Sequence, residues 1–127
     1  MNMGTIIERI CPECSYRKEF YEGVGMGGRN SYIIRSVFTP EEIADFSKKL
    51  EENRIKDYLL SKHVGYCKKC NSLESVCFLD YTDTADNKVQ IQKPCPACES
   101  MLDFSDKKEE CPVCSALLIK AQIGVWD

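Results

Sequence analysis

The sequence contains a single histidine, a single tryptophan and no surplus of positive charge. It has no Gly-x-Ser-x-Gly motif and no cluster of carboxylates in a recognisable catalytic spacing, so no nucleophile and base can be paired. Its 17 lysines and arginines are outnumbered by 20 aspartates and glutamates, a net charge of −3 that excludes a polybasic nucleic-acid arm. No stretch approaches the ~18 uninterrupted apolar residues that a membrane helix needs. These absences predict a non-enzymatic protein without a membrane span.

Residues 1–5 open neither a secretory signal nor a transit peptide, so we expect no such targeting segment. The chain has 127 residues, of which 43% are hydrophobic and 29% charged, as in an ordinary globular protein. Such a length allows one small domain or two very small ones. We therefore expect a compact cytoplasmic protein.

What the chain does have is cysteine, with nine in all. Two thiolates of a Cys-x-x-Cys turn, here called a knuckle, point at one place, and two knuckles close a tetrahedron around Zn²⁺ at Zn–S distances of ~2.3 Å. One such pair could be a redox motif, but four in one chain make metal binding the better interpretation. The spacing predicts two structural zinc ions, with no coordination position left for water. The eight ligands are Cys11 and Cys14, Cys67 and Cys70, Cys95 and Cys98, and Cys111 and Cys114.

Which knuckles share a metal is a second inference. Twelve residues separate the third knuckle from the fourth, a loop typical of one ribbon hairpin, so we expect these two to share a zinc ion. The first and second knuckles would then close across 52 residues, which is tolerable because the entropy of loop closure grows only logarithmically. An interleaved pairing is the alternative, and it separates knuckles that are close in sequence.

The Cys-Pro-x-Cys knuckles at Cys95 and Cys111 resemble those of rubredoxin-like zinc ribbons. The stretch from Cys11 to Tyr16, followed by Gly23-Val24-Gly25-Met26, is similar to the opening of small, uncharacterised bacterial zinc-ribbon proteins. This resemblance covers residues ~8–26 and the three later knuckles. It implies zinc and a ribbon fold, and it implies no activity. In such proteins a glycine usually follows each knuckle. In this chain the residues at those positions are Ser15, Asn71, Glu99 and Ser115. The absence of these glycines weakens an iron-binding interpretation.

Hydrophobic patterns place strands and helices around the knuckles. We expect extended segments over 5–10, 16–22, 32–38, 73–81 and 89–92, and a pair of strands, 117–119 and 123–126, that complete the second sheet. Thr39-Pro40-Glu41-Glu42 forms a capping box that opens a helix over 40–52, followed by a second helix over 54–63 or a bend.

The predicted fold is a small, metal-stabilised α+β protein with two zinc-ribbon β units. The first spans residues 1–82 and contains a helical insertion at about 39–63. The second spans residues 83–127, and the boundary falls in the polar turn at 82–87.

Three further features receive structural interpretations. Residues 23–28 hold four glycines but no helix or Lys-Ser/Thr follows, which indicates a turn rather than a phosphate loop, and we expect no small-molecule ligand. Cys77, the odd cysteine, lies in an expected strand and is interpreted as a small buried hydrophobe. His63 is expected at a helix C-terminus, without a metal role.

The leading functional prediction is a module that binds another protein, with Tyr66 and Trp126 as candidate anchors. Core packing is the favoured role for at least one of the two, because so small a chain has few large residues to bury. A second hypothesis is nucleic-acid binding through five cations that form one basic spot if the first two knuckles share a zinc ion. Two Zn(Cys)₄ centres, each of charge −2, would take the net charge from −3 to about −7, which disfavours that contact. A third hypothesis is rubredoxin-like electron transfer by Fe(Cys)₄. The five cations are Arg17, Lys18, Arg29, Lys68 and Lys69.

Overall fold

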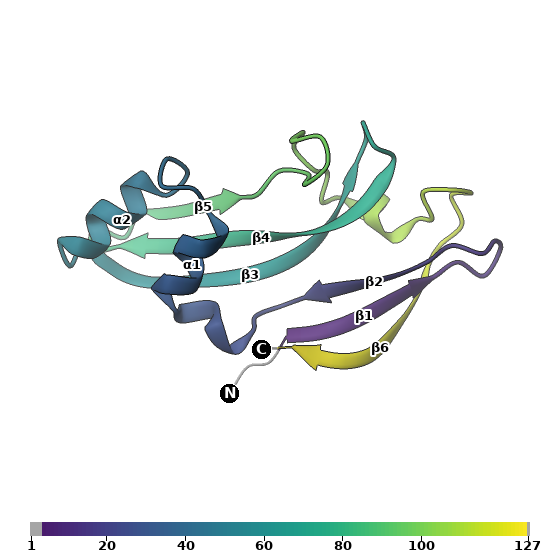
Figure 1. The fold of residues 1–127 in the computed structure, drawn as a ribbon, viewed down its shortest axis with the longest axis horizontal. Helices are drawn as coiled ribbons and strands as arrows, with labels where there is room; N and C mark the ends of the chain where they lie inside the picture. Colours follow the sequence, from purple (N-terminus) through teal and green to yellow (C-terminus); the bar gives the residue numbers. More distant parts are fainter. Residues whose placement is uncertain (1–3, 127) are drawn as a thin grey trace.

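A computed structural model describes residues 4–126, which form a small α+β fold with two helices and two antiparallel three-stranded sheets (Figure 1). The strand order is β2-β1-β6 in the first sheet and β3-β4-β5 in the second. The elements are β1 (Gly4–Ile10), β2 (Arg17–Glu22), α1 (Ser31–Val37), α2 (Ala44–Glu51), β3 (Ile55–Cys67), β4 (Ser72–Asp83), β5 (Lys88–Gln92) and β6 (Ile119–Trp126).

The first sheet joins the two ends of the chain. The β1–β2 hairpin confirms the strands expected on either side of the first knuckle. The C-terminal segment forms one strand, β6, which pairs with β1 from Gly4↔Trp126 to Ile10↔Ile119. The expected pairing of 117–119 with 123–126 was therefore wrong, because β1 offered a longer ladder. In the first sheet β1 pairs with β6, and in the second β4 pairs with β5. Both sheets therefore combine strands from the two sides of the expected boundary at residue 82.

The β3–β4 hairpin runs from the helical end of the molecule to the second knuckle at its tip (Figure 1). The helix expected over 54–63 was wrong, because these residues belong to β3. Their apolar residues fit a helix locally, but Leu60 and Val64 also alternate on one strand face, and both are buried there. His63 consequently lies in mid-strand rather than at a helix end.

Helix α1 replaces the extended segment expected over 32–38. The Asn30 side chain caps it, since its Oδ1 accepts hydrogen bonds from the backbone N–H groups of Tyr32 and Ile33 at 2.9 and 3.4 Å. Burial of Ile34 against the second sheet then outweighs the strand preference of the β-branched residues in this segment.

The helix expected over 40–52 is confirmed in part as α2. The capping box is present: the Thr39 N–H donates to Glu42 Oε1 at 2.8 Å, and the Glu42 N–H donates to Thr39 Oγ1 at 3.2 Å. Residues 40–43 form a turn before the helix. Asn53 ends the segment in the left-handed conformation, with φ 56°.

Both faces of the β3–β4 hairpin carry core residues: on one face Val76 and Phe78 pack on Leu102, and the other face packs on the helices and the first sheet. Near the open end of the hairpin, both helices pack on Leu60, Leu79 and Tyr81. Near its tip, Phe20 of the first sheet packs on Val64 and Leu73. Between these regions a two-residue bridge links Gly23 to Lys62 through backbone hydrogen bonds of 2.9 and 2.8 Å. The φ of +88° at Gly23 is one that side-chain-bearing residues rarely adopt, so glycine is required at this joint.

Candidate metal centres

The four knuckles meet in two groups, and the pairing expected from the sequence was wrong. The first group joins the first and fourth knuckles through Cys11, Cys14, Cys111 and Cys114. The second group joins the second and third knuckles through Cys67, Cys70, Cys95 and Cys98. The interleaved alternative is not observed either: the pairing is nested, with the second and third knuckles between the first and the fourth in sequence, and each group still contains four sulfur atoms.

Strand pairing explains the exchange of partners. The Ile10↔Ile119 pair at the end of the β1–β6 ladder places the first knuckle beside the fourth. Strand β5 runs antiparallel to β4, toward the tip of the long hairpin, and the Lys93 N–H continues this path by donating to the Cys77 carbonyl at 3.0 Å. The third knuckle thereby reaches the second.

The sulfur positions fit a tetrahedral ion. The Sγ atoms of Cys11 and Cys114 lie 3.4 Å apart, those of Cys14 and Cys111 3.6 Å, and all four within 4.8 Å. In the second group, the Sγ atoms of Cys67 and Cys98 lie 3.4 Å apart, again within a 4.8 Å set. A tetrahedron with Zn–S bonds of ~2.3 Å has sulfur–sulfur edges of about 3.8 Å. All nine cysteines are free of disulfides, so both groups can hold a metal ion.

In three of the four knuckles a backbone N–H group points at the first sulfur of the turn. The N–H groups of Glu13, Val113 and Cys70 each lie 3.4 Å from the Sγ of the preceding Cys11, Cys111 and Cys67. These contacts stabilise a negatively charged thiolate, which is the form that binds metal.

The crowded thiols of the first group ionise unequally. Burial raises the pKa of Cys11, but hydrogen bonds from the Glu13 N–H and the Cys114 thiol outweigh it and lower that pKa to about 7. The Tyr16 N–H lowers the pKa of Cys14, whereas burial and the neighbouring thiols raise it to about 12. A divalent cation would remove this conflict by letting all four thiols ionise.

The second group has the same asymmetry. The hydroxyl and the N–H of Ser100 lower the pKa of Cys98 to about 6. The contact with Cys98, together with burial, raises the pKa of Cys70 to about 12. Both groups thus combine a stabilised thiolate with thiols that need a cation to ionise.

Three of the four residues that follow a knuckle adopt a backbone conformation that favours glycine. Asn71, Glu99 and Ser115 adopt left-handed φ values of 51°, 62° and 69°. Ser15 is the one residue of the four that does not share this conformation. Only Asn tolerates it well, so Glu99 and Ser115 carry backbone strain.

We expect Glu99→Gly and Ser115→Gly each to stabilise the protein by about 1 kcal/mol, because glycine accepts positive φ without a Cβ clash. Urea denaturation of the metal-loaded protein measures the change. Ser15→Gly is the matched control, and it should stabilise nothing because Ser15 has no positive φ. Equal effects at all three positions would contradict strain as the cause.

The two groups are in direct structural contact. Asn71, in the second knuckle's turn, donates from Nδ2 to the carbonyl of Pro112 in the fourth knuckle at 2.8 Å. Its Oδ1 accepts from the Tyr66 hydroxyl at 2.7 Å. Asn71 therefore ties the second group to the first, and Tyr66, a candidate anchor, serves this internal link.

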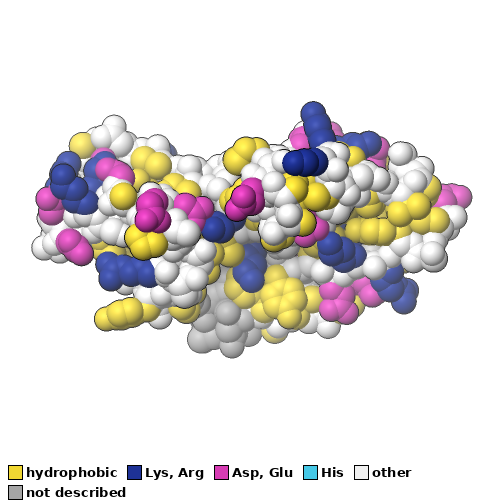
Figure 2. Space-filling view, turned by 45° about the horizontal axis from the view of Figure 1, so that its top comes forward, with side chains coloured by type: hydrophobic (Ala, Val, Ile, Leu, Met, Phe, Trp, Pro, Cys, Tyr) yellow, Lys and Arg dark blue, Asp and Glu magenta, His cyan; other side chains and the backbone are white. Residues whose placement is uncertain are grey.

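The condition for one basic spot among the five candidate nucleic-acid cations is not met, because the first two knuckles belong to different groups. Arg17 pairs with Glu8 at 3.4 Å, Lys18 with Glu74 at 3.1 Å, and Arg29 with Asp57 at 3.7 Å. Lys68 and Lys69 are exposed in the second knuckle. Figure 2 shows cations and carboxylates interspersed on the face in view.

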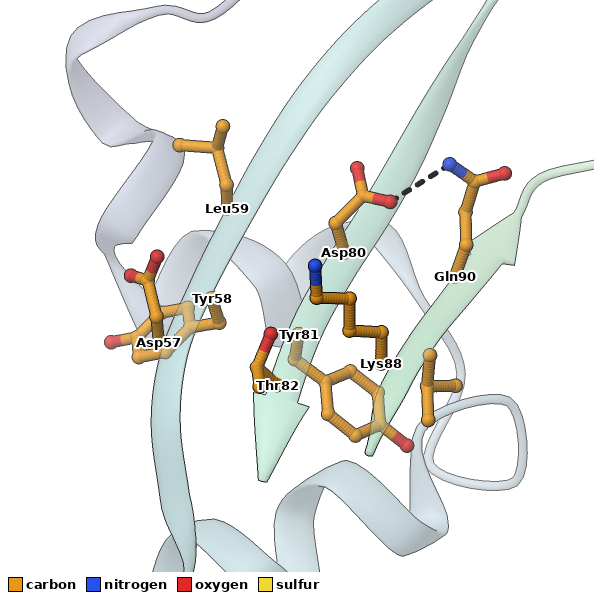
Figure 3. A pocket seen from close by; sticks show the side chains of 9 residues that line it. Asp57, Tyr58, Leu59, Asp80, Tyr81, Thr82, Lys88 and Gln90 are labelled. Atoms are coloured by element: carbon orange, nitrogen blue, oxygen red, sulfur yellow. Dashed lines mark hydrogen bonds between the residues drawn. The ribbon is translucent and has the colours of Figure 1, made fainter. Parts of the chain in front are cut away.

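A shallow hollow of 290 Å³ lies away from the knuckles, at the open end of the second sheet (Figure 3). Asp80 and Gln90 reach toward each other there from neighbouring strands, with Gln90 Nε2 donating to Asp80 Oδ1 at 2.8 Å. Asp57, on its rim, faces Arg29 across the ion pair already described. This hollow is a polar sheet surface rather than a part of the metal centres.

Comparison of the chain with protein-family models, curated proteins and solved structures finds no match. Two four-cysteine groups assembled from Cys-x-x-Cys knuckles are consistent with zinc-ribbon-like sites. Among residues 4–126, no helix is both long and apolar enough to cross a membrane.

Proposed function

We propose that this protein is a non-catalytic zinc-ribbon protein, in which two structural zinc ions hold a surface for binding another protein. Four thiolates fill a tetrahedral zinc shell, so neither centre offers a coordination position to a substrate. The metal then contributes to folding rather than to a reaction. A cytoplasmic location belongs to the same proposal, because a reducing compartment keeps thiols available for metal.

The observation that carries the protein-binding role is the open, apolar edge that strand β6 forms. Among the described residues β6 pairs only with β1, which leaves its outer edge open. Ile119, Ile123 and Val125 are 55%, 50% and 51% exposed. The strand contains no aspartate or glutamate, and its single cation, Lys120, is already paired with Glu109 at 3.0 Å.

An open apolar edge of this kind fits an extended segment of a partner protein. Such a segment adds a strand to the sheet through backbone hydrogen bonds, while its alternate side chains contact the exposed apolar residues. The fourth knuckle extends the same apolar region, since Val113 and Leu117 are 72% and 71% exposed. The first metal centre would hold β6 in place, because Cys114 lies five residues before it.

Site-specific photocrosslinking in the source cell tests this role. A photoreactive residue at position 123 should give one discrete adduct with a different protein, identifiable by mass spectrometry, and Val125→Lys should abolish it. The same residue at position 88, exposed on β5 of the other sheet, is the control and should give no such adduct. Adducts at position 123 only with a second copy of this chain would replace the proposal with self-association.

Two other hypotheses have less support. Nucleic-acid binding loses three of its five cations to ion pairs with carboxylates. Electron transfer requires iron in the same four-sulfur groups, and a coloured, iron-containing protein would favour it.

A further inference from the structure

A second, apolar cavity lies where both sheets meet helix α1. Its volume is 420 Å³, within the range of small-molecule sites. Ile33 and Val37 of α1 and Leu60 of β3 form its apolar part. Two aromatic side chains from the first sheet, Tyr21 and Trp126, form the opposite part, with their rings stacked 6.1 Å apart. Helix α1, strand β3 and strands β2 and β6 of the first sheet therefore all line the cavity.

Among the described residues that line this cavity, one carries a charge, the ammonium of Lys62. Its Nζ lies 5.2 Å from the ring centroid of Tyr21 and 4.9 Å from that of Trp126. These cation–π contacts hold the ammonium in position without neutralising it. Among residues 4–126, no carboxylate lies within ion-pair distance of Lys62, and its Nζ donates no hydrogen bond.

A neighbouring lysine shows that this arrangement is unusual in the chain. Lys93 lines a separate hollow on the other side of Cys77 and also contacts an aromatic ring, that of Phe38, at 5.5 Å. Unlike Lys62, it is neutralised by Glu42 at 2.9 Å. Lys62 is thus a positioned ammonium in an apolar cavity without a protein counterion among the described residues.

We propose that this cavity binds a small amphipathic carboxylate. The carboxylate would accept hydrogen bonds from the Lys62 ammonium, which has three donors. The apolar body would pack on Leu60, Val37 and Ile33 and be enclosed by Tyr21 and Trp126. This site differs from the expectation of no small-molecule ligand, which rested on the glycine loop alone. Sequence reasoning missed it because its residues come from six separate elements, among them a short 3₁₀ helix over Met26–Arg29.

The only tryptophan of the chain lines the cavity, so its fluorescence reports binding directly. The probe is octanoate, compared with octan-1-ol and octylammonium, which share its chain but not its charge. Octanoate should change the emission saturably and bind at least tenfold more tightly than either control. Octylammonium should be excluded, because its charge repels Lys62.

Variants test the role of the ammonium. Lys62→Met keeps the apolar stem of the side chain and should weaken octanoate binding at least tenfold, whereas Lys62→Arg should retain it. Lys93→Met is the matched control and should bind octanoate like the wild type, because Lys93 is already paired. Equal binding of octanoate and octan-1-ol, or no binding of either, would overturn the proposal.

A second readout uses Cys77, which lines the cavity beside Lys62, its partner across β3 and β4. Burial raises the pKa of the Cys77 thiol, so alkylation by iodoacetamide should be slow but measurable. Octanoate should slow it further in the wild type and not in Lys62→Met. This readout rests on the proposed function, since the other eight thiols must be protected by metal. The fluorescence titration does not depend on metal binding, so the cavity proposal and the proposed zinc-ribbon function can fail separately.

Discussion

Replacing Cys111 by serine is expected to release one of two zinc ions and to unfold the first sheet. A serine hydroxyl does not ionise near neutral pH, so the first group would keep three thiolates and lose most of its affinity. Structural zinc contributes an apparent ~10–16 kcal/mol in small zinc domains, which is comparable to the whole stability of a typical domain. Cys111 is also 2% exposed and packs with Phe20 and Leu118, so the substitution removes core contacts as well.

Metal analysis and hydrogen exchange measure this result. Wild-type protein should be colourless with two zinc ions per chain, and Cys111→Ser should hold one. Backbone amides of both β1 and β6 should lose protection together, because the first and fourth knuckles belong to one group. Cys77→Ser is the control that should retain two ions, since Cys77 belongs to neither group.

One result would contradict the structural role of the metal, and another would contradict the pairing of the first knuckle with the fourth. One is a chelator that removes the ions while leaving circular dichroism and thermal melting unchanged. The other is Cys111→Ser protein with normal protection in β1, which would mean that the first knuckle is held by a different partner.

The eight cysteines of the two groups could be predicted from spacing, but their pairing could not. Knuckle geometry is local, because three residues decide where two thiols point. Pairing depends on contacts between β1 and β6, at opposite ends of the sequence. The entropy difference between a 12-residue and a 96-residue loop is only about 2 kcal/mol. Seven paired positions between β1 and β6 can outweigh it, at roughly 0.2–1 kcal/mol per cross-strand pair.

Strand β3 shows a similar limit. Ile55, Tyr58 and Leu59 have helical spacing, and the residues of β3 also fit a strand that alternates through Leu60 and Val64. A short apolar segment does not distinguish the two, so the partner strand β4 decides. Asn53, in left-handed conformation after α2, was the local sign that the helix ends there.

Capping boxes and knuckle-flanking strands, by contrast, were predictable because their determinants are neighbours in sequence. Thr39 and Glu42 make both hydrogen bonds of the box. The position of β2 follows from the first knuckle, whose Cys11 N–H donates to the Tyr16 carbonyl at 2.9 Å and reverses the chain.

The second metal centre should be sensitive to a single methyl group at Gly65. This glycine lies in β3 beneath residues 102–104, and a Cβ there would come 2.7 Å from Cε1 of Phe104 and 2.9 Å from Cβ of Leu102. The loop cannot easily move away, because Tyr66 and Asp103 exchange two backbone hydrogen bonds of 2.8 Å. Overpacking of this kind costs about 1–3 kcal/mol.

We therefore expect Gly65→Ala to lower the free energy of unfolding by about 1–3 kcal/mol and to speed the release of one zinc ion to a chelator. The ion affected should be that of the second group, because the displaced loop begins just after Cys98, whereas the first group lies outside it. Native mass spectrometry during chelation would follow the two ions separately. Gly124→Ala is the matched control, since its new Cβ would meet Ile6 Cδ1 at an ordinary 3.4 Å. If Gly65→Ala released both ions at the same faster rate, contact through Asn71 would couple the centres more strongly than the loop separates them.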